Sequence, residues 1–313
     1  MQARLKVRRY NPESGQGPWY QSYELTVPDY ATVLDALVQV REELDETLAL
    51  RCSCRSAICG SCAMRINGHA RLACKGRVAQ LQPQDGEILV EPMGNMPVIK
   101  DLVADMGIHW DKVGAVDPWL KPAGPPPERE YIVPNQRMLE LTQVMSCIMC
   151  GACVSDCTVL EVDKNFLGPA ALAKAYRFVG DPRDAAEKER LGNLSQYGGV
   201  WDCTHCFECV EVCPKGVAPM DQIMILREKA VAEGYTNNNG TRHHRAIIDS
   251  VRRRGRLDEL MLMPKSVGMF NIRELLRLAP GALRLARAGK LPFPRHSAEH
   301  KEKVARIFEK LEK

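Results

Sequence analysis

The run Cys147-Ile-Met-Cys-Gly-Ala-Cys-Val-Ser-Asp-Cys157 is matched in its spacing by Cys203-Thr-His-Cys-Phe-Glu-Cys-Val-Glu-Val-Cys213. Both runs have the form Cys-x2-Cys-x2-Cys-x3-Cys, which is typical of cysteines that bind cubane iron-sulfur clusters. Eight thiolates at this spacing predict two such clusters in one domain.

The ligands of the two clusters are expected to interleave. Where two clusters of this kind share a domain, the first three cysteines of a run bind one cluster and the fourth binds the other. This rule predicts one 4Fe-4S cluster on Cys147, Cys150, Cys153 and Cys213. It predicts another cluster on Cys157, Cys203, Cys209 and, if that cluster holds four irons, Cys206. Pro214 follows the second run, as is habitual for the motif, whereas the first run has Thr158 at that place.

Structural zinc and disulfide bonds are the alternatives for these cysteines. Zinc prefers four ligands in two well-separated pairs, and disulfides need an oxidising compartment and are usual in small secreted chains. Neither pattern describes two overlapping four-cysteine runs, so both alternatives are disfavoured.

A third cysteine group lies upstream, where Cys54-x4-Cys59-x2-Cys62 is followed by Cys74. This is the plant-type ligand spacing for a 2Fe-2S cluster. The small residues of the loop, Ser56, Ala57, Gly60 and Ser61, allow it to bend tightly and to aim backbone N–H groups at sulfur. Cys52 is the one cysteine left over, and a small buried thiol is the favoured interpretation of it.

The length and composition of the chain limit the classes of protein to which it can belong. The chain has 313 residues, 45% of them hydrophobic, which suits two modest folded cores. No run of eighteen apolar residues occurs, so no membrane span is predicted. Residues 1–10 alternate apolar and polar side chains, which predicts a strand and not a targeting segment. A reducing cytoplasm, in which thiolates stay available to iron, follows as the expected location.

The net charge of +4 is unevenly distributed. Residues 241–313 hold 18 Lys and Arg against 8 Asp and Glu, a net charge of +10, which leaves −6 for residues 1–240. The basic tail predicts contact with anionic lipid headgroups or with an acidic partner, and a solvated helical surface is the alternative. Nothing in the sequence predicts a nucleic-acid partner.

The first 105 residues predict an α+β domain of the β-grasp type around the 2Fe-2S loop. Strands are expected at residues 2–10 and 21–28, and a helix capped by Thr32 should follow. Residues 63–66 and 70–74 flank Asn67-Gly68, the dipeptide that most favours a two-residue hairpin turn. A last strand is expected at residues 88–91.

Three further segments follow. Residues 106–134 predict an irregular linker that contains the proline-dense stretch 121–128. Residues 135–240 predict an all-α domain that carries the two four-cysteine runs, with helices at 138–144, 169–178 and 220–233. Residues 241–313 predict a basic helical extension.

The order of these motifs resembles the iron-sulfur subunit of succinate dehydrogenase and fumarate reductase, respiratory complex II. The resemblance covers roughly residues 3–235 and extends beyond the cysteine spacing. The matching segments are Arg51-Cys-Ser-Cys-Arg, Ile58-Cys-Gly-Ser-Cys, Asn67-Gly68, Leu72-Ala-Cys74, Ser146-Cys-Ile-Met-Cys, Gly168-Pro169, Ala175-Tyr-Arg-Phe178 with Asp181, and Val212-Cys-Pro-Lys-Gly216.

The resemblance implies a function in electron transfer. A flavoprotein partner oxidises succinate to fumarate on its FAD, and electrons pass singly through 2Fe-2S, 4Fe-4S and a third cluster to a membrane quinone. The chain itself is expected to hold no FAD and no acid-base catalytic residue. Its expected place is the cytoplasmic face of the cell membrane, held peripherally by one or more anchor subunits.

The sequence departs from the common family pattern at the third cluster. Many members have an aliphatic residue where Cys206 stands, and their third cluster is 3Fe-4S. An available thiolate beside an open iron corner favours a 4Fe-4S cluster here, and the alternative is a rotated Cys206 packed as a small hydrophobe. Thr204 and His205 are candidates to lie near the quinone, although a supporting or surface role is favoured for His205. Val162 occupies the usual position of a quinone-pocket tryptophan.

The C-terminal extension is longer than in most members, and residues 243–254 and 275–291 look more like the ends of heterodisulfide-reductase-type subunits. They suggest an unusual membrane anchor. Leucines between 275 and 285 alternate with arginines in a stripe that suits either a membrane surface or a partner subunit. Pro280-Gly281 is expected to interrupt that helix.

Two other functions compete with succinate dehydrogenase. One is the iron-sulfur subunit of fumarate reductase or of another flavin-linked dehydrogenase of the heterodisulfide reductase or glycolate oxidase kind. The other is a soluble redox sensor with no flavoprotein partner. The separate 2Fe-2S domain with its arginine-flanked loop disfavours heterodisulfide- and glycolate-type subunits.

Overall fold

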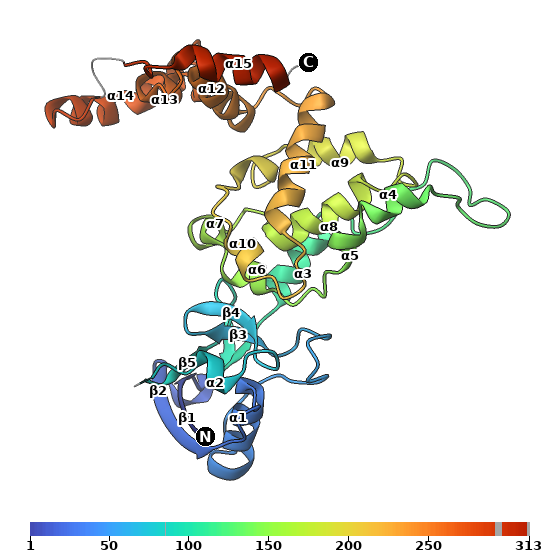
Figure 1. Ribbon diagram of the computed structural model, residues 1–313, viewed down its shortest axis with the longest axis vertical. Helices are drawn as coiled ribbons and strands as arrows, with labels where there is room; N and C mark the ends of the chain where they lie inside the picture. The colour runs from blue at the N-terminus through green and yellow to red at the C-terminus, as the bar shows by residue number, and fades with distance from the viewer. Residues whose placement is uncertain (85, 292–295, 312–313) are drawn as a thin grey trace. The chain divides into compact units, whose positions relative to one another are not determined.

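The computed structural model describes residues 1–84, 86–291 and 296–311. Its chain divides into two compact units, residues 1–229 and residues 230–313. Figure 1 draws both units with most of their helices and strands labelled.

The first unit begins with a five-stranded sheet in the order β2-β1-β5-β3-β4. Its central pair, β1 (Gln2–Arg9) and β5 (Ile88–Glu91), runs parallel, and β2 (Trp19–Thr26) pairs antiparallel with β1. Alternate residues of β1 are buried, as the alternation of apolar and polar side chains predicts. Helix α1 (Val33–Gln39) begins at a capping box between Thr32 and Asp35 and continues as η2 (Val40–Leu44). The predicted α+β ferredoxin-like domain is therefore confirmed.

The hairpin of β3 (Ala63–Ile66) and β4 (His69–Leu72) turns at Asn67-Gly68, as predicted. Both turn residues have positive φ, 51° and 82°, which the two-residue turn requires. The Asn67 side chain also accepts a hydrogen bond from the amide of Leu89 and donates one to the carbonyl of Leu81. The hairpin is thereby fastened to β5 and to the end of α2 (Val78–Leu81).

A buried polar network ties the start of the chain to the end of this domain. The Arg9 guanidinium is 3% exposed and donates to Asp101, Asp45, Tyr23 and Thr47. Asp101 also accepts from the amides of Tyr10 and Ala49. Because every partner is hydrogen-bonded, the buried charges are compensated.

Short strands β6 (Val98–Lys100) and β7 (Val103–Ala104) lead into helix α3 (Gly107–Gly114), which packs against α8. The expectation that residues 106–134 are irregular was wrong for α3. Only His109 and Val113 of that helix are buried, so its apolar pattern is weak. The proline-dense stretch 121–128 contains neither helix nor strand, as expected.

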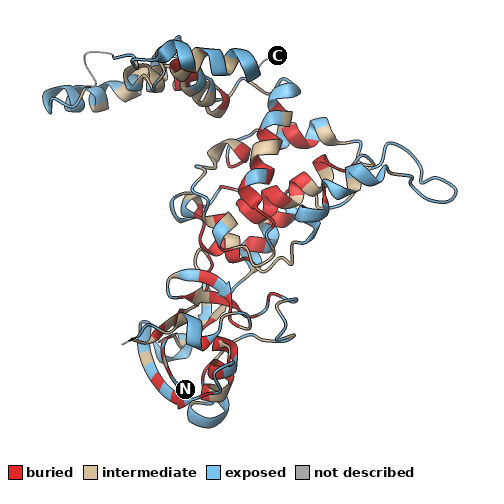
Figure 2. Ribbon diagram, viewed as in Figure 1, coloured by how far each residue is buried: buried red, intermediate tan, exposed pale blue. Residues whose placement is uncertain are grey.

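The helical part of the first unit consists of α8 (Pro169–Val179), several shorter helices and the longer α11 (Pro219–Ala232), whose end belongs to the second unit. The shorter helices are α4 (Asn135–Leu139), α5 (Thr142–Met145), α6 (Ala152–Ser155), α7 (Thr158–Val162), α9 (Glu187–Leu194), η3 (Val200–Asp202) and α10 (Glu208–Glu211). Figure 2 shows α8 almost wholly buried, and its alanine-rich sequence allows neighbouring elements to approach closely. The predicted helices at 169–178 and 220–233 correspond to α8 and α11. The helix predicted at 138–144 is divided between α4 and α5.

The second unit contains α12 (Asn239–Arg254), α13 (Glu259–Val267), α14 (Ile272–Arg287) and α15 (Lys301–Leu311). Helix α12 contacts α13 and α15. The expected interruption at Pro280-Gly281 was wrong, because α14 is continuous through both residues. Proline at this place removes the N–H that would bond the carbonyl of Leu276. The helix tolerates the loss on its solvent-exposed surface, where Leu276 is 67% exposed.

Candidate functional site

The 2Fe-2S loop folds around Cys54. Its sulfur accepts hydrogen bonds from the amides of Ser56, Ile58 and Cys59, each at 3.3 Å, and the Cys74 sulfur accepts one from Ala57 at 3.3 Å. Positive φ angles at Arg55, Ala57 and Gly60 turn these amides toward the sulfurs. A loop that presents N–H groups to thiolates stabilises negative charge at its centre.

The four cysteines of this loop lie in different surroundings. Cys62 is buried, Cys59 is exposed, and Cys54 and Cys74 lie between these extremes. Hydrogen bonds lower the pKa of Cys59 to about 6, and the largest contribution comes from the Ser61 hydroxyl. Burial, in contrast, raises the pKa of Cys62 to about 12. One edge of the site is therefore open to solvent and the other faces the protein.

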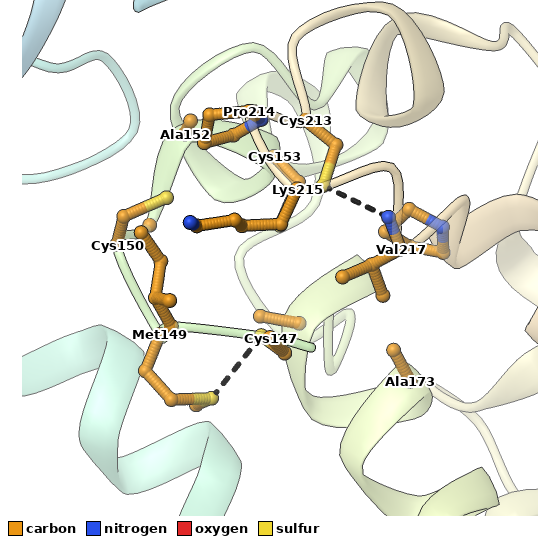
Figure 3. A pocket seen from close by; sticks show the side chains of 14 residues that line it. Cys147, Met149, Cys150, Ala152, Cys153, Ala173, Cys213, Pro214, Lys215 and Val217 are labelled. Carbon is orange, nitrogen blue, oxygen red and sulfur yellow. Dashed lines mark hydrogen bonds between the residues drawn. The ribbon is translucent and has the colours of Figure 1, made fainter. Parts of the chain in front are cut away.

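The second group of cysteines lines one pocket. Figure 3 shows Cys147, Cys150 and Cys153 on one segment and Cys213 on another, all at the same pocket. The rest of the lining is largely apolar and comes from α6, α8 and the segment after Cys213. The structure thus brings together the four residues that the interleaving rule assigns to one cluster.

Burial dominates the electrostatics of this pocket. It raises the pKa of Cys147, that of Cys150 to about 11, and that of Cys153 well above its usual value, and the neighbouring thiols add to the effect. The Cys213 sulfur accepts a hydrogen bond from the Val217 amide at 3.3 Å. Neutral thiols are favoured in this apolar setting, so a charged thiolate here needs the compensating positive charge of iron.

The third group, Cys157, Cys203, Cys206 and Cys209, lines another pocket with Thr204, Phe207 and residues of α8 and α11. Cys157 and Cys209 are buried, and burial raises the pKa of Cys209 to about 12. Cys206 is exposed, and its sulfur accepts a hydrogen bond from the Thr158 hydroxyl at 3.4 Å. It lies on the pocket with the other three and is not packed as a small hydrophobe.

His205 is turned toward Arg227 of α11. The guanidinium contacts the Nε2 atom of His205 and donates to the carbonyls of Cys203 and Val200, each at 2.8 Å. It also stacks on Trp201. Burial, with the nearby guanidinium, lowers the pKa of His205. Arg227, which sequence reasoning missed, is thus the residue that holds the loop between Cys203 and Cys206.

The first two cysteine groups approach each other at Gly60 and Cys150. A Cβ atom built on Gly60 would lie 2.7 Å from the Cβ of Cys150, which is too close for two carbon atoms. Both residues line the same cavity, together with Met93, Met106 and Met149. Only a residue without a side chain permits this contact.

Further contacts hold the sheet domain against residues 154–157, at the end of α6 and just after it. The side-chain Nδ2 of Asn95 donates to the carbonyls of Val154, Ser155 and Cys157 at 3.0–3.1 Å. The Asp156 carboxylate accepts from the Ala70 amide at 2.7 Å. Sequence reasoning missed Asn95 and Asp156 because a polar residue in a loop carries no signal of its distant partner.

The donor sets fit iron-sulfur clusters in their chemistry. Each group supplies four soft sulfur atoms, and each has amide or hydroxyl hydrogens directed at sulfur. Among the residues that the structure describes, no group of three or more His, Cys, Asp or Glu side chains is placed to hold a single metal ion. Of the described helices, none is long and apolar enough to span a membrane.

Two family models match the chain. A 2Fe-2S iron-sulfur cluster binding domain matches residues 4–111, and a 4Fe-4S dicluster domain matches residues 143–217. The first contains the loop of Cys54 to Cys74, and the second contains both four-cysteine runs.

Named relatives cover most of the chain. It is 41% identical to the fumarate reductase iron-sulfur subunit of Mycobacterium tuberculosis, over 70% of this chain and 89% of that protein. It is 34% identical to the succinate dehydrogenase iron-sulfur subunit of Paracoccus denitrificans, over 73% of this chain and 88% of that protein. Among solved structures, a chain of the Mycobacterium smegmatis Sdh1 complex matches with a TM-score of 0.61 and 27% identity, over 75% of this chain and 98% of that one.

Proposed function

Since the chain belongs to the family of iron-sulfur subunits of succinate dehydrogenase and fumarate reductase, we propose that it works within a succinate dehydrogenase. In this role it receives electrons from the FAD of a flavoprotein subunit and delivers them to a membrane quinone. The observation that carries the proposal is the gathering of twelve of the thirteen cysteines at three sites within one compact unit.

The proposed ligand sets follow the three sites. They are Cys54, Cys59, Cys62 and Cys74 for the 2Fe-2S cluster, Cys147, Cys150, Cys153 and Cys213 for a 4Fe-4S cluster, and Cys157, Cys203, Cys206 and Cys209 for the third cluster. When bound, such clusters supply reversible one-electron oxidation and reduction. The chain contributes the thiolates, the amides that donate to sulfur, and a largely apolar lining that tunes the potentials.

A third cluster with four irons is the form that the geometry favours. Cys206 lines the pocket with Cys157, Cys203 and Cys209, and the Thr158 hydroxyl donates to its sulfur. A thiolate at that place fills the corner that an aliphatic residue would leave open. A 3Fe-4S cluster with Cys206 unused is the alternative.

The side of the third pocket near Thr204 is the proposed approach for the quinone. Thr204 and Phe207 line that pocket, and Phe207 is an exposed apolar residue. Val162, five residues after the pocket residue Cys157, is exposed and apolar as well. His205 has its ring engaged by Arg227, which supports a positioning role for it and not direct contact with the quinone. One or more anchor subunits would hold the complex at the cytoplasmic face of the membrane.

The direction of catalysis is proposed as succinate oxidation, with fumarate reductase as the alternative. Relatives with both names match the chain. The choice depends on the reduction potentials of the clusters and of the quinone, because the same electron path serves both directions.

Electron paramagnetic resonance of the purified complex tests the proposal. Succinate should reduce the clusters only when the flavoprotein partner is present, and dithionite should reduce all of them. The isolated chain with its clusters assembled is the control, since it should respond to dithionite and not to succinate. A complex that shows no succinate-induced signal while it responds to dithionite would refute the assignment to succinate dehydrogenase.

A further inference from the structure

Helix α14, in the second compact unit, is amphipathic and has no buried residue. Of its apolar side chains, Ile272 is 70% exposed and Leu276 67%, and Leu283 and Leu285 are exposed as well. Phe270, just before the helix, is 97% exposed. Figure 2 likewise shows α14 without buried positions. Among the described residues of its unit, none buries this face, and only Leu275 and Leu278 of the face are partly covered.

The apolar and basic side chains of α14 occupy separate sectors. At about 100° per residue, its Ile, Leu and Ala side chains fall within one half of the helix circumference. Four arginines fall together in the other half, within about a quarter of the circumference. These arginines are Arg273, Arg277, Arg284 and Arg287.

The charge of the segment is one-sided. Residues 268–290 contain five basic residues, the four arginines and Lys290, against the single acidic residue Glu274. Glu274 forms a salt bridge with Arg277, with 3.0 Å between Oε1 of Glu274 and Nη1 of Arg277. The surface beside the apolar stripe is therefore strongly cationic, and the complementary surface must be anionic.

We propose that α14, together with Phe270, inserts its apolar face into the headgroup region of a membrane that contains anionic lipids. A helix that separates a polar face rich in arginine from an apolar face of exposed leucine and phenylalanine suits this depth of the bilayer. Sixteen residues with four arginines do not span a bilayer, so the helix lies in the plane of the membrane. This contact is made by the chain itself and does not depend on the proposed electron transfer.

An acidic protein surface is the competing occupant. A protein groove that covered α14 would have to cover a stripe half the helix wide and also neutralise the arginines at its edge. A lipid surface meets both demands at once, because acyl chains accept any apolar side chain and phosphates accept each guanidinium. The lipid surface is therefore the favoured occupant.

Sedimentation of the full-length chain, with its clusters assembled, with lipid vesicles tests the proposal. The chain should bind vesicles of phosphatidylglycerol and phosphatidylcholine and should bind pure phosphatidylcholine much less. Binding should weaken as salt rises, since salt screens the arginines from the headgroups. Equal binding to both kinds of vesicle, or no binding, would overturn the proposal.

Two variants separate the apolar and the basic contributions. Leu276→Glu with Leu283→Glu places charges on the inserted face and should abolish vesicle binding. Arg273→Gln with Arg284→Gln should weaken it by about 30-fold, if each cation near an anionic surface contributes as is usual. Arg277 is kept because it is already bonded to Glu274.

Ile248→Glu is the matched control. Ile248 is an exposed apolar residue on α12 of the same unit, 45% exposed, and lies outside the proposed face. The Ile248→Glu variant should bind vesicles as the unchanged chain does. Circular dichroism and the visible absorption of the clusters should be the same in all variants, since the substituted side chains are exposed or only partly buried.

Failure of this proposal is distinguishable from failure of the electron-transfer assignment. If the α14 variants bind vesicles normally but no longer co-purify with a partner subunit, α14 is covered by protein and the lipid proposal is wrong. Succinate-dependent reduction of the clusters is a separate readout and should not change in either variant.

Discussion

The backbone of Gly60 packs against the side chain of Cys150 so closely that Gly60 has no room for a methyl group. Gly60 belongs to the loop of the first cysteine group, and Cys150 to the second. The missing side chain therefore lets two proposed redox sites lie against each other. The contact also fixes the sheet domain to the helical domain at the place where an electron would cross.

Gly60→Ala should slow electron transfer between the first and second sites. The new Cβ would lie 2.7 Å from the Cβ of Cys150, so the loop must move away and the path lengthens. The φ angle of 76° adds backbone strain, which costs about 1–2 kcal/mol. Rapid-freeze electron paramagnetic resonance after mixing the complex with succinate measures the rate.

Gly68→Ala is the control for that strain. Gly68 has φ of 82° and nothing within 4 Å of a built Cβ, so it loses stability by a similar mechanism without touching either site. If both variants transfer electrons at the same rate, the Gly60–Cys150 contact has no part in the path.

Cys206→Ser should convert the third cluster from four irons to three. The change removes one sulfur from the four that line the pocket, while the hydroxyl is smaller and a poorer ligand for iron. The oxidised protein should then show the near-isotropic resonance of a three-iron cluster, and iron analysis should fall by one iron per chain. An unchanged spectrum would mean that Cys206 is not a ligand. Cys52→Ser is the comparison, because Cys52 belongs to none of the three groups.

Arg9→Met should destabilise the first domain by about 3–5 kcal/mol, because it leaves Asp101 buried without its cation. Urea unfolding, followed by circular dichroism, measures the loss. Arg8→Met is the matched control, since Arg8 is the preceding residue of the same strand and is only partly buried. Its free energy of unfolding should change by less than about 0.5 kcal/mol. Equal effects would mean that the Arg9 network contributes nothing.

His109 should make the stability of the protein fall in acid. It is 1% exposed, neither ring nitrogen has a hydrogen-bond partner among the described residues, and burial lowers its pKa. A lowered pKa means that the unfolded chain binds the proton more tightly. The contribution of neutral His109 is thus complete above about pH 6.5 and is lost as the pH falls below it.

His109→Phe should remove this part of the pH dependence, so that the variant gains stability relative to the unchanged chain between pH 7 and pH 5. Thermal unfolding at a series of pH values measures the difference. His69→Phe is the comparison, since it makes the same replacement at an exposed position. A parallel pH profile for His109→Phe and the unchanged chain would show that His109 does not titrate on unfolding.

The sequence predicted what depends on local spacing. The cysteine runs, the Asn67-Gly68 turn and the Thr32 cap are each specified within a few residues, and the structure has the predicted hairpin and helix start. The interleaving rule carries long-range information, and the structure places Cys213 on one pocket with the first run. That these four cysteines bind one cluster stays a prediction. The close contacts of Gly60 with Cys150 and of Asn95 with α6 did not, because each joins loops far apart in the chain.

Two predictions about helices were wrong, one for α3 and one for α14, and each error has a physical reason. Helix α3 buries only two residues, so it has almost no apolar periodicity to detect. Helix α14 continues through Pro280 although proline disfavours a helix interior. Leu276, whose carbonyl loses its N–H partner at Pro280, is an exposed residue. Water at this surface would reduce the penalty that the sequence alone suggests.

The interleaved cysteine runs set the order in which the three sites obtain their full sets of cysteines during translation. The loop of Cys54 to Cys74 is complete when only the first quarter of the chain has been made. The pocket of Cys147, Cys150 and Cys153 has to wait for Cys213, which is synthesised after Cys203, Cys206 and Cys209. With the proposed pairing, the third site has all its ligands slightly earlier than the second, although its first cysteine is made later. Iron delivery to a nascent chain would thus fill the sites in an order that differs from the order of electron flow.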